Sequence, residues 1–220
     1  MTKLIAFEGI SGSGKSYLIK SIISKNKKCE AVKWFDNELS SSLLGNVHNL
    51  VPVSHDFFST CYALDFYGSY KYRIKEKIKD TNLLLHRYIY TPLTHDLVRG
   101  SSKEMLNALY EPAKIIEPNM IVYMNTPPNV AYERIIKTRK PSFYECGLDC
   151  FMMSDLDQAK SDYNNNNFSN DFLKNCYLEF QCQIVSEYEK LLGNKSNVLW
   201  IDYRKDISEY IEYINSYIQN

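Results

Sequence analysis

The chain has 220 residues, of which 45% are hydrophobic, so it can bury one well-packed core. Its 26 Lys and Arg residues balance 26 Asp and Glu residues, which argues against a nucleic-acid polymer or a membrane surface as its partner. No apolar run is long enough to span a membrane, and we find no export signal. The six cysteines form no C-x-x-C pair, so we expect reduced thiols and a cytoplasmic protein.

A phosphate-binding pattern follows the first apolar run of the chain. Residues 4–7 predict a buried strand, and apolar residues at helical spacing from 18 to 23 predict a helix. The segment between them, GISGSGKS at 9–16, matches the pattern G-x-x-x-x-G-K-[ST]. Its glycines allow backbone N–H groups and the helix N-terminus to surround phosphate oxygens. A glycine-rich turn that matches by chance is the alternative, but the flanking strand and helix favour a nucleotide site.

The loop therefore predicts binding of ATP together with Mg²⁺. Lys15 is expected to reach the β- and γ-phosphates, and the Ser16 hydroxyl to ligate the metal ion. The expected ATP-binding residues are Gly9, Ser11, Gly12, Ser13, Gly14, Lys15 and Ser16.

The next part of the chain contains a strand pattern and a long helical pattern. Residues 31–35 predict a second strand, and 36–50 form a mixed stretch whose serines at 40–42 indicate a turn or a helix start. Aromatic residues at positions 58, 62, 66 and 70 predict one long helix over 56–79. Core packing is the simpler explanation of this aromatic stripe, and a ligand-binding wall is the alternative.

The alternation of strands and helices continues to the end of the chain. Residues 82–86 predict a buried strand that leads into Arg87, and open α/β sheets bind ligands beyond such strand ends. Further helices are predicted over 91–97, 102–116, 126–138, 172–192 and 207–218, and further strands over 120–124 and 198–201. This order predicts an α/β fold, a five-stranded parallel sheet with helices on both faces.

One stretch lacks a sustained apolar period. Residues 140–171, with four asparagines at 164–167, predict a mobile lid or a surface insertion. Four cations lie at its start: Arg134, Lys137, Arg139 and Lys140. Such residues commonly complement a helix dipole, but a closing lid can also bring an arginine onto a transferring phosphoryl group.

The order of these motifs resembles that of one known family. FEGISGSGKS comes first, residues 62–66 lie in the aromatic helix, His86-Arg87-Tyr88 follow the third strand, and a basic lid covers 134–145. These segments resemble the patterns F-E-G-x-[DE]-G-x-G-K-[ST], F-x-A-D-R, D-R-[YF] and the arginine-bearing lid of thymidylate kinases, which are P-loop nucleoside-monophosphate kinases. The resemblance covers nearly the whole chain, and it implies a single P-loop kinase domain over 1–220 with 139–171 as the lid.

By this resemblance, the protein would transfer the γ-phosphoryl group of ATP to a nucleoside monophosphate such as dTMP. Arg87 would hold the acceptor phosphate and Tyr62 would stack on its base, while Arg134 and Arg139 would join Lys15 and Arg87 as catalytic cations. The acceptor phosphate is already ionised, so no general base is needed. Family members are commonly dimers, which makes a homodimer an expectation by analogy.

Several positions depart from the family's patterns. Ser11 and His86 replace acids of the phosphate loop and of D-R-[YF], respectively. At the base end, Phe66 replaces an arginine, and Asp96, next to His95, replaces a glutamine. Donors that would face a pyrimidine carbonyl are therefore absent, and we expect an altered base preference. The expected substrate-binding residues are Tyr62, Phe66, Arg87, His95 and Asp96.

Two other functions remain open. A kinase for a nucleoside or another small hydroxyl acceptor would need a carboxylate base, and Asp96 or Glu8 could serve. A nucleotide-binding protein with little catalysis would result if Ser11 and His86 mark a decayed site. A signalling GTPase is disfavoured, because the sequence contains no N-K-x-D motif.

Overall fold

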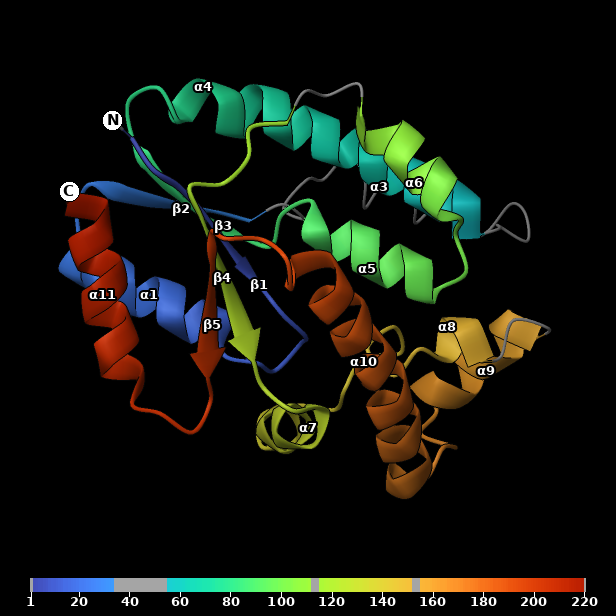
Figure 1. Ribbon diagram of the computed structural model, residues 1–220. Coiled ribbons are helices and arrows are strands. Elements are labelled where there is room, and N and C mark those ends of the chain that lie inside the picture. The colour runs from blue at the N-terminus through green and yellow to red at the C-terminus, as the bar shows by residue number, and fades with distance from the viewer. Residues whose placement is uncertain (1, 34–54, 112–114, 152–154, 220) are drawn as a thin grey trace.

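The computed structural model describes residues 2–33, 55–111, 115–151 and 155–219 (Figure 1). Within this part of the chain, five strands form one parallel sheet in the order β2-β3-β1-β4-β5. The strands are β1 (Leu4–Glu8), β2 (Cys29–Lys33), β3 (Asn82–His86), β4 (Met120–Asn125) and β5 (Val198–Asp202). The predicted α/β fold with a five-stranded parallel sheet is confirmed.

The central strand β1 is covered on both faces. Leu4 and Ala6 pack into one core cluster and Ile5 and Phe7 into a second, because successive side chains of a strand point to opposite faces. The first cluster lies under the helices α3 (His55–Ser69), α5 (Tyr90–Val98) and α10 (Asn170–Leu192). The second lies under α1 (Lys15–Lys25) and α11 (Ile207–Gln219), on the opposite side of the sheet in Figure 1.

The helix predicted over 56–79 is a helical run with a π-helical segment. It consists of α3, the π-helix η1 (Tyr70–Ile74) and α4 (Lys75–Lys77). Phe66 in its aromatic stripe is fully buried and packs against the rings of Tyr70, Tyr88 and Tyr110. Core packing therefore explains the stripe at this position.

Most of the predicted elements differ from the structure at their ends, usually by one or two residues, and two show this best. β2 begins at Cys29, two residues before its predicted start, while its predicted end at 34–35 and the mixed stretch 36–50 lie outside the described residues. The helix predicted over 102–116 is α6 (Lys103–Tyr110), capped by the Ser102 hydroxyl, and 115–118 are not helical. The early end agrees with the sequence, because Glu111 is followed by a proline, which lacks the backbone N–H that a helix interior requires.

The segment predicted as a lid or insertion contributes its own small core. Between α7 (Pro128–Ile136) and α10 lie α8 (Leu148–Phe151) and α9 (Leu156–Asn164). Their cluster comprises Tyr132, Ile135, Phe143, Cys146, Leu148, Ala159, Leu173, Cys176 and Tyr177. The described residues of this segment thus pack together, and its role as a lid or insertion stays a prediction. Short helices that each bury one or two apolar side chains leave no sustained period to detect.

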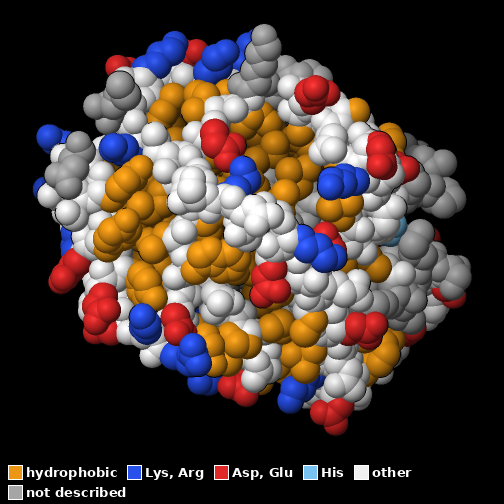
Figure 2. Space-filling model, viewed as in Figure 1, with side chains coloured by type: hydrophobic (Ala, Val, Ile, Leu, Met, Phe, Trp, Pro, Cys, Tyr) orange, Lys and Arg blue, Asp and Glu red, His pale blue; other side chains and the backbone are white. Residues whose placement is uncertain are grey.

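The surface mixes charge with apolar patches. Figure 2 shows acidic and basic side chains interspersed over the viewed face, with hydrophobic groups between them. Among the described helices, none combines the length and apolar character that a membrane span requires.

Replacing Phe66 tests the packing of the aromatic helix. We expect Phe66→Ala to lower the free energy of unfolding by about 3 to 5 kcal/mol, because it leaves a cavity among three other rings. Urea denaturation followed by circular dichroism measures this change. The matched control is Leu64→Ala on the same helix, whose side chain is 63% exposed and should change stability by less than about 0.5 kcal/mol. Equal effects of the two substitutions would contradict the packing described here.

Candidate functional site

The glycine-rich loop leaves the carboxyl end of β1 and leads into α1. Gly9, Gly12 and Gly14 have φ angles of 129°, 78° and 103°, in the left-handed region that favours glycine. At Gly12 a Cβ atom would also lie 2.5 Å from the carbonyl oxygen of Ala131 in α7. The loop therefore requires glycine at this position, both for its backbone conformation and for its contact with α7.

Lys15 lies folded against the loop that precedes it. Its Nζ donates to the carbonyl oxygens of Gly9 at 2.8 Å and Ile10 at 2.7 Å, and to Ser13 Oγ at 3.2 Å. Burial and the nearby positive charge of Arg87 lower the pKa of Lys15. The ammonium is thus positioned by loop carbonyls within the same turn that phosphate oxygens would occupy.

The next residue of the loop contacts the neighbouring strand. Ser16 Oγ lies 3.0 Å from Nε2 of His86, the last residue of β3. Burial, with the positive charge of Lys15, lowers the pKa of His86 to about 3, so its imidazole is neutral at pH 7.

Arg87 connects the loop to the adjacent helix α5. It follows β3 with a φ of 71°, an uncommon conformation for a residue other than glycine. Its guanidinium lies 3.4 Å from Ser11 Oγ, 3.2 Å from Thr91 Oγ1 and 3.5 Å from His95 Nε2. The arginine predicted to hold a phosphate therefore faces the glycine-rich loop.

A buried carboxylate supports this turn. Glu8 accepts hydrogen bonds from the Tyr88 backbone N–H at 2.7 Å, the Thr91 hydroxyl at 2.6 Å and the Tyr188 hydroxyl at 2.8 Å. Burial raises the pKa of Glu8, although these donors and Arg87 act in the opposite direction. With three donors already bonded, Glu8 is suited to positioning the turn rather than to accepting a proton from a substrate.

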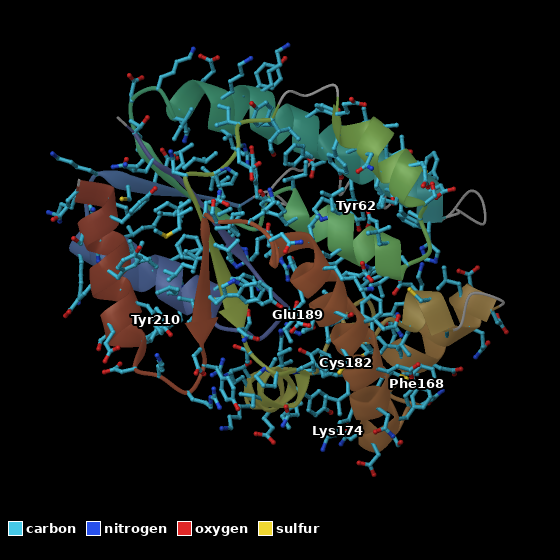
Figure 3. All side chains as sticks on the ribbon, viewed as in Figure 1. Tyr62, Phe168, Lys174, Cys182, Glu189 and Tyr210 are labelled. Atoms are coloured by element: carbon cyan, nitrogen blue, oxygen red, sulfur yellow. The ribbon has the colours of Figure 1, made fainter. Side chains whose placement is uncertain are left out.

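A cavity of about 220 Å³ opens beside Arg87, beyond the carboxyl end of β3. Its lining includes four of the five predicted substrate-binding residues, which are Tyr62, Arg87, His95 and Asp96. Figure 3 shows Tyr62 between α3 and α5. Phe66 does not line this cavity, because it points into the aromatic core. The rest of the lining is Ser11, Thr91, Pro92, Arg99, Tyr144, Glu145 and Gln181.

The two predicted lid arginines have different partners. Arg134 of α7 donates to the carbonyl oxygen of Ser13 at 3.2 Å, so it lies at the glycine-rich loop. Arg139 forms two 2.7 Å hydrogen bonds with the carboxylate of Glu145. Burial would raise the pKa of Glu145, but hydrogen bonds from Arg139 and from the Ser142 backbone hold it at about 2. Glu145 thus connects Arg139 to the cavity.

Sequence reasoning missed several residues of the cavity. Arg99 pairs with Asp149 at 2.8 Å, and its guanidinium carbon lies 4.9 Å from the centre of the Phe180 ring. Gln181, one residue further along α10, donates to the Glu145 carbonyl oxygen at 2.8 Å. Only the spacing of Arg99, four residues after His95, could have signalled its position on the same helix face.

A parallel sheet whose first strand leads into a phosphate loop, with a cationic cavity beside that loop, defines the class as a P-loop protein of the nucleoside-monophosphate kinase fold. No protein-family model matches the chain. It is 29% identical over 225 residues to probable thymidylate kinase 2 of Saccharolobus solfataricus, covering 95% of this chain and 97% of the relative. A probable thymidylate kinase of Methanococcus maripaludis is 25% identical over 143 residues, covering 65% and 70%. These similarities support membership of the thymidylate kinase family.

The buried Asp96 makes stability depend on pH. Burial raises the pKa of Asp96 from 3.8 to about 6. This shift corresponds to a change of roughly 3 kcal/mol in the free energy of unfolding between low and high pH. A carboxyl group with a raised pKa stabilises the fold fully at low pH, and this contribution is lost as the pH rises through about 6. We therefore expect Asp96→Asn to gain stability relative to the wild type, by up to about 3 kcal/mol, between pH 4 and pH 7.5. Urea denaturation across this range measures the difference, and parallel curves for the two proteins would contradict it.

Proposed function

We propose that the protein transfers the γ-phosphoryl group of ATP to a nucleoside monophosphate, with a base preference that differs from that of typical thymidylate kinases. One observation carries this proposal: cations from three separate elements meet at one loop. Lys15 lies within the loop, Arg87 contacts Ser11 after β3, and Arg134 contacts Ser13 from α7. Phosphoryl transfer depends mainly on such positioning and charge, because negative charge is spread over the oxygens of the transferring group.

The glycine-rich loop would bind the ATP phosphates. Residues 9–16 supply backbone N–H groups, and Lys15 would exchange its two loop carbonyls for phosphate oxygens. Mg²⁺, which would offset phosphate charge when bound, fits beside the Ser16 hydroxyl, and the neutral His86 adjoins that hydroxyl at 3.0 Å. Because imidazole replaces a carboxylate here, Ser16 and the phosphates would carry more of the metal binding than in the family's pattern.

The cavity beside the loop would hold the acceptor nucleotide. Arg87 faces both Ser11 and the cavity, so its guanidinium would bind the acceptor phosphate next to the ATP site. Tyr62 lines the cavity from α3 and would contact the base. A phosphate acceptor needs no general base, which agrees with the full hydrogen bonding of Glu8.

The segment 139–171 would act as a lid on this site. Arg134 already contacts the loop, whereas Arg139 would have to leave Glu145 before it could bind a phosphoryl group. We therefore assign the larger catalytic role to Arg134 and a role on closure to Arg139, within a single kinase domain over 1–220.

An acceptor panel tests the proposed reaction. The protein is incubated with Mg²⁺, ATP and each of the common nucleoside and deoxynucleoside monophosphates, and ADP and diphosphate products are measured by chromatography. We expect formation of a nucleoside diphosphate. Transfer only to nucleosides, or to no acceptor while ATP still raises the melting temperature, would reject the proposal.

Lys15→Ala should abolish most transfer, because it removes the charge nearest the β- and γ-phosphates. We expect a loss in kcat of about 10² to 10³-fold, as for removal of one transition-state donor. Steady-state kinetics with the best acceptor of the panel measures this loss. The matched control is Lys20→Ala, since Lys20 is exposed on the same helix and should leave kcat unchanged. A Lys15 variant with wild-type kcat would contradict the assignment.

Arg87→Ala should affect the acceptor more than ATP. We expect a rise in the acceptor KM and a fall in kcat, each of about tenfold or more, because a charged hydrogen bond is worth about 1.5 to 3 kcal/mol. The ATP KM should change by less than about threefold. Arg204→Ala is the control. Arg204 is exposed, pairs with Asp202 and is distant from Arg87 in the sequence. Equal changes in both KM values would remove Arg87 from the acceptor side.

A further inference from the structure

Two buried oxygens of residues that line the cavity have no hydrogen-bond donor among the described residues. One is Oδ2 of Asp96, whose side chain is 4% exposed, and the other is Oε1 of Gln181, which is 1% exposed. Both residues line the cavity. A buried acceptor that lacks a donor destabilises a protein by about 1 to 3 kcal/mol, so two beside one cavity indicate a ligand that supplies the donors.

The hydrogen bonds on the other atoms of these groups fix them as acceptors. The Gln181 amide donates from Nε2 to the Glu145 carbonyl oxygen at 2.8 Å, and the reverse orientation would bring two oxygens together. The Asp96 carboxylate accepts from the Ser59 hydroxyl, which leaves Oδ2 as the oxygen without a partner. An ionised carboxylate can only accept.

Arg99, which follows Asp96 by three residues and also lines the cavity, donates three hydrogen bonds to protein acceptors. Arg99 donates from Nε to Asp149 Oδ2 at 2.8 Å, from one terminal nitrogen to the His95 carbonyl at 3.4 Å, and from the other to the Tyr144 carbonyl at 3.3 Å. Its guanidinium is therefore held in place by protein acceptors.

Asp96 and Arg99 come after Thr91 and His95, the two residues of α5 that contact Arg87. Thr91, His95 and Arg99 follow one another at four-residue spacing along α5, from the side of Arg87 to the end of the helix. The five residue steps from Thr91 to Asp96 span about 7.5 Å of helix, so Asp96 lies beyond the first contact of Arg87 with α5. With the acceptor phosphate on Arg87, the base would reach Asp96 and the Arg99 side, where Gln181 adjoins Phe180.

We propose that the acceptor nucleotide carries a base with an exocyclic amino group, which donates to the Asp96 carboxylate and the Gln181 carbonyl. This inference rests on the proposed kinase function and specifies its acceptor. Cytosine presents N4–H₂ and adenine N6–H₂, whereas thymine and uracil present the acceptor O4 at the corresponding edge. A site built from acceptors discriminates against that carbonyl, because two acceptors then face each other without a proton.

Direct binding of matched nucleotides tests this inference without ATP. Calorimetry with dCMP and dUMP compares bases that differ mainly in the amino and carbonyl group at position 4, and dAMP and dTMP extend the comparison. We expect either dCMP or dAMP to bind at least about tenfold more tightly than dUMP and dTMP. This factor follows from the free-energy cost of leaving one buried acceptor without a donor. Equal or tighter binding of dUMP or dTMP overturns the proposal.

Substitution of Asp96 tests the assigned contact. In Asp96→Asn the Ser59 hydroxyl can still donate to the remaining oxygen, and an N–H₂ group replaces Oδ2. We expect the preference for the amino-bearing base to fall at least about tenfold, with tighter binding of dUMP. Asp157→Asn, at an exposed position of α9, is the matched control and should keep the preference. An unchanged preference in Asp96→Asn overturns the proposal.

A second variant and a second readout keep the tests separate. Gln181→Met removes the other acceptor. It should weaken binding of the preferred nucleotide severalfold and leave the binding of dUMP unchanged. Equal weakening of both nucleotides overturns the role of Gln181.

The kinase assay is then run with the same nucleotides. Binding preference without any transfer would reject the proposed function and support the base inference. Transfer that favours dTMP would support the function and overturn the inference.

Discussion

The site depends on the buried Glu8 carboxylate at the end of β1. Glu8 joins three elements, because it accepts from the backbone after β3, from Thr91 at the start of α5 and from Tyr188 of α10. The strands themselves reinforce this junction, since Phe7 pairs with His86 and its carbonyl accepts from the Arg87 N–H at 3.0 Å. The glycine-rich loop and Arg87 are therefore adjacent because β1 and β3 are neighbours in the sheet. Two groups that are distant in sequence, and to which the proposed function assigns phosphate binding, therefore share one edge of the fold.

Some of this arrangement could be predicted because it depends on short, contiguous sequence patterns. The glycine loop is a contiguous pattern, and the strands β3 and β4 are short apolar runs with turn residues on both sides. Arg87 follows such a run directly, so its place at a strand end needed only the fold class. Local patterns of this kind do not depend on which distant residues pack against them.

The errors concern residues whose role is set by distant partners. Tyr62 and Phe66 are four residues apart on one helix, yet Tyr62 lines the cavity and Phe66 packs against Tyr88 and Tyr110. Helical spacing places both side chains on the same face of α3. Their different roles depend on which residues of other elements pack against each of them. Glu145 and Gln181 join the site from a segment without sustained apolar period and from a long helix. Their position arises from packing between α10 and the segment before it, which no spacing along the chain encodes.

Glu145 links Arg87 to the lid arginine Arg139 through a series of hydrogen bonds. Arg87 bonds to Ser11, and Ser11 in turn donates to the Glu145 carboxylate, which also accepts from Arg139 and from the Ser142 backbone N–H. Because the pKa of Glu145 is about 2, this carboxylate stays ionised wherever the protein works near neutral pH. In the proposed reaction, an acceptor phosphate on Arg87 would bring a second anion next to Glu145. Repulsion between the two would favour separation of Glu145 from the site, and with it the release of Arg139 toward the phosphate. The same substrate charge that Arg87 binds would thus be the force that engages the lid arginine.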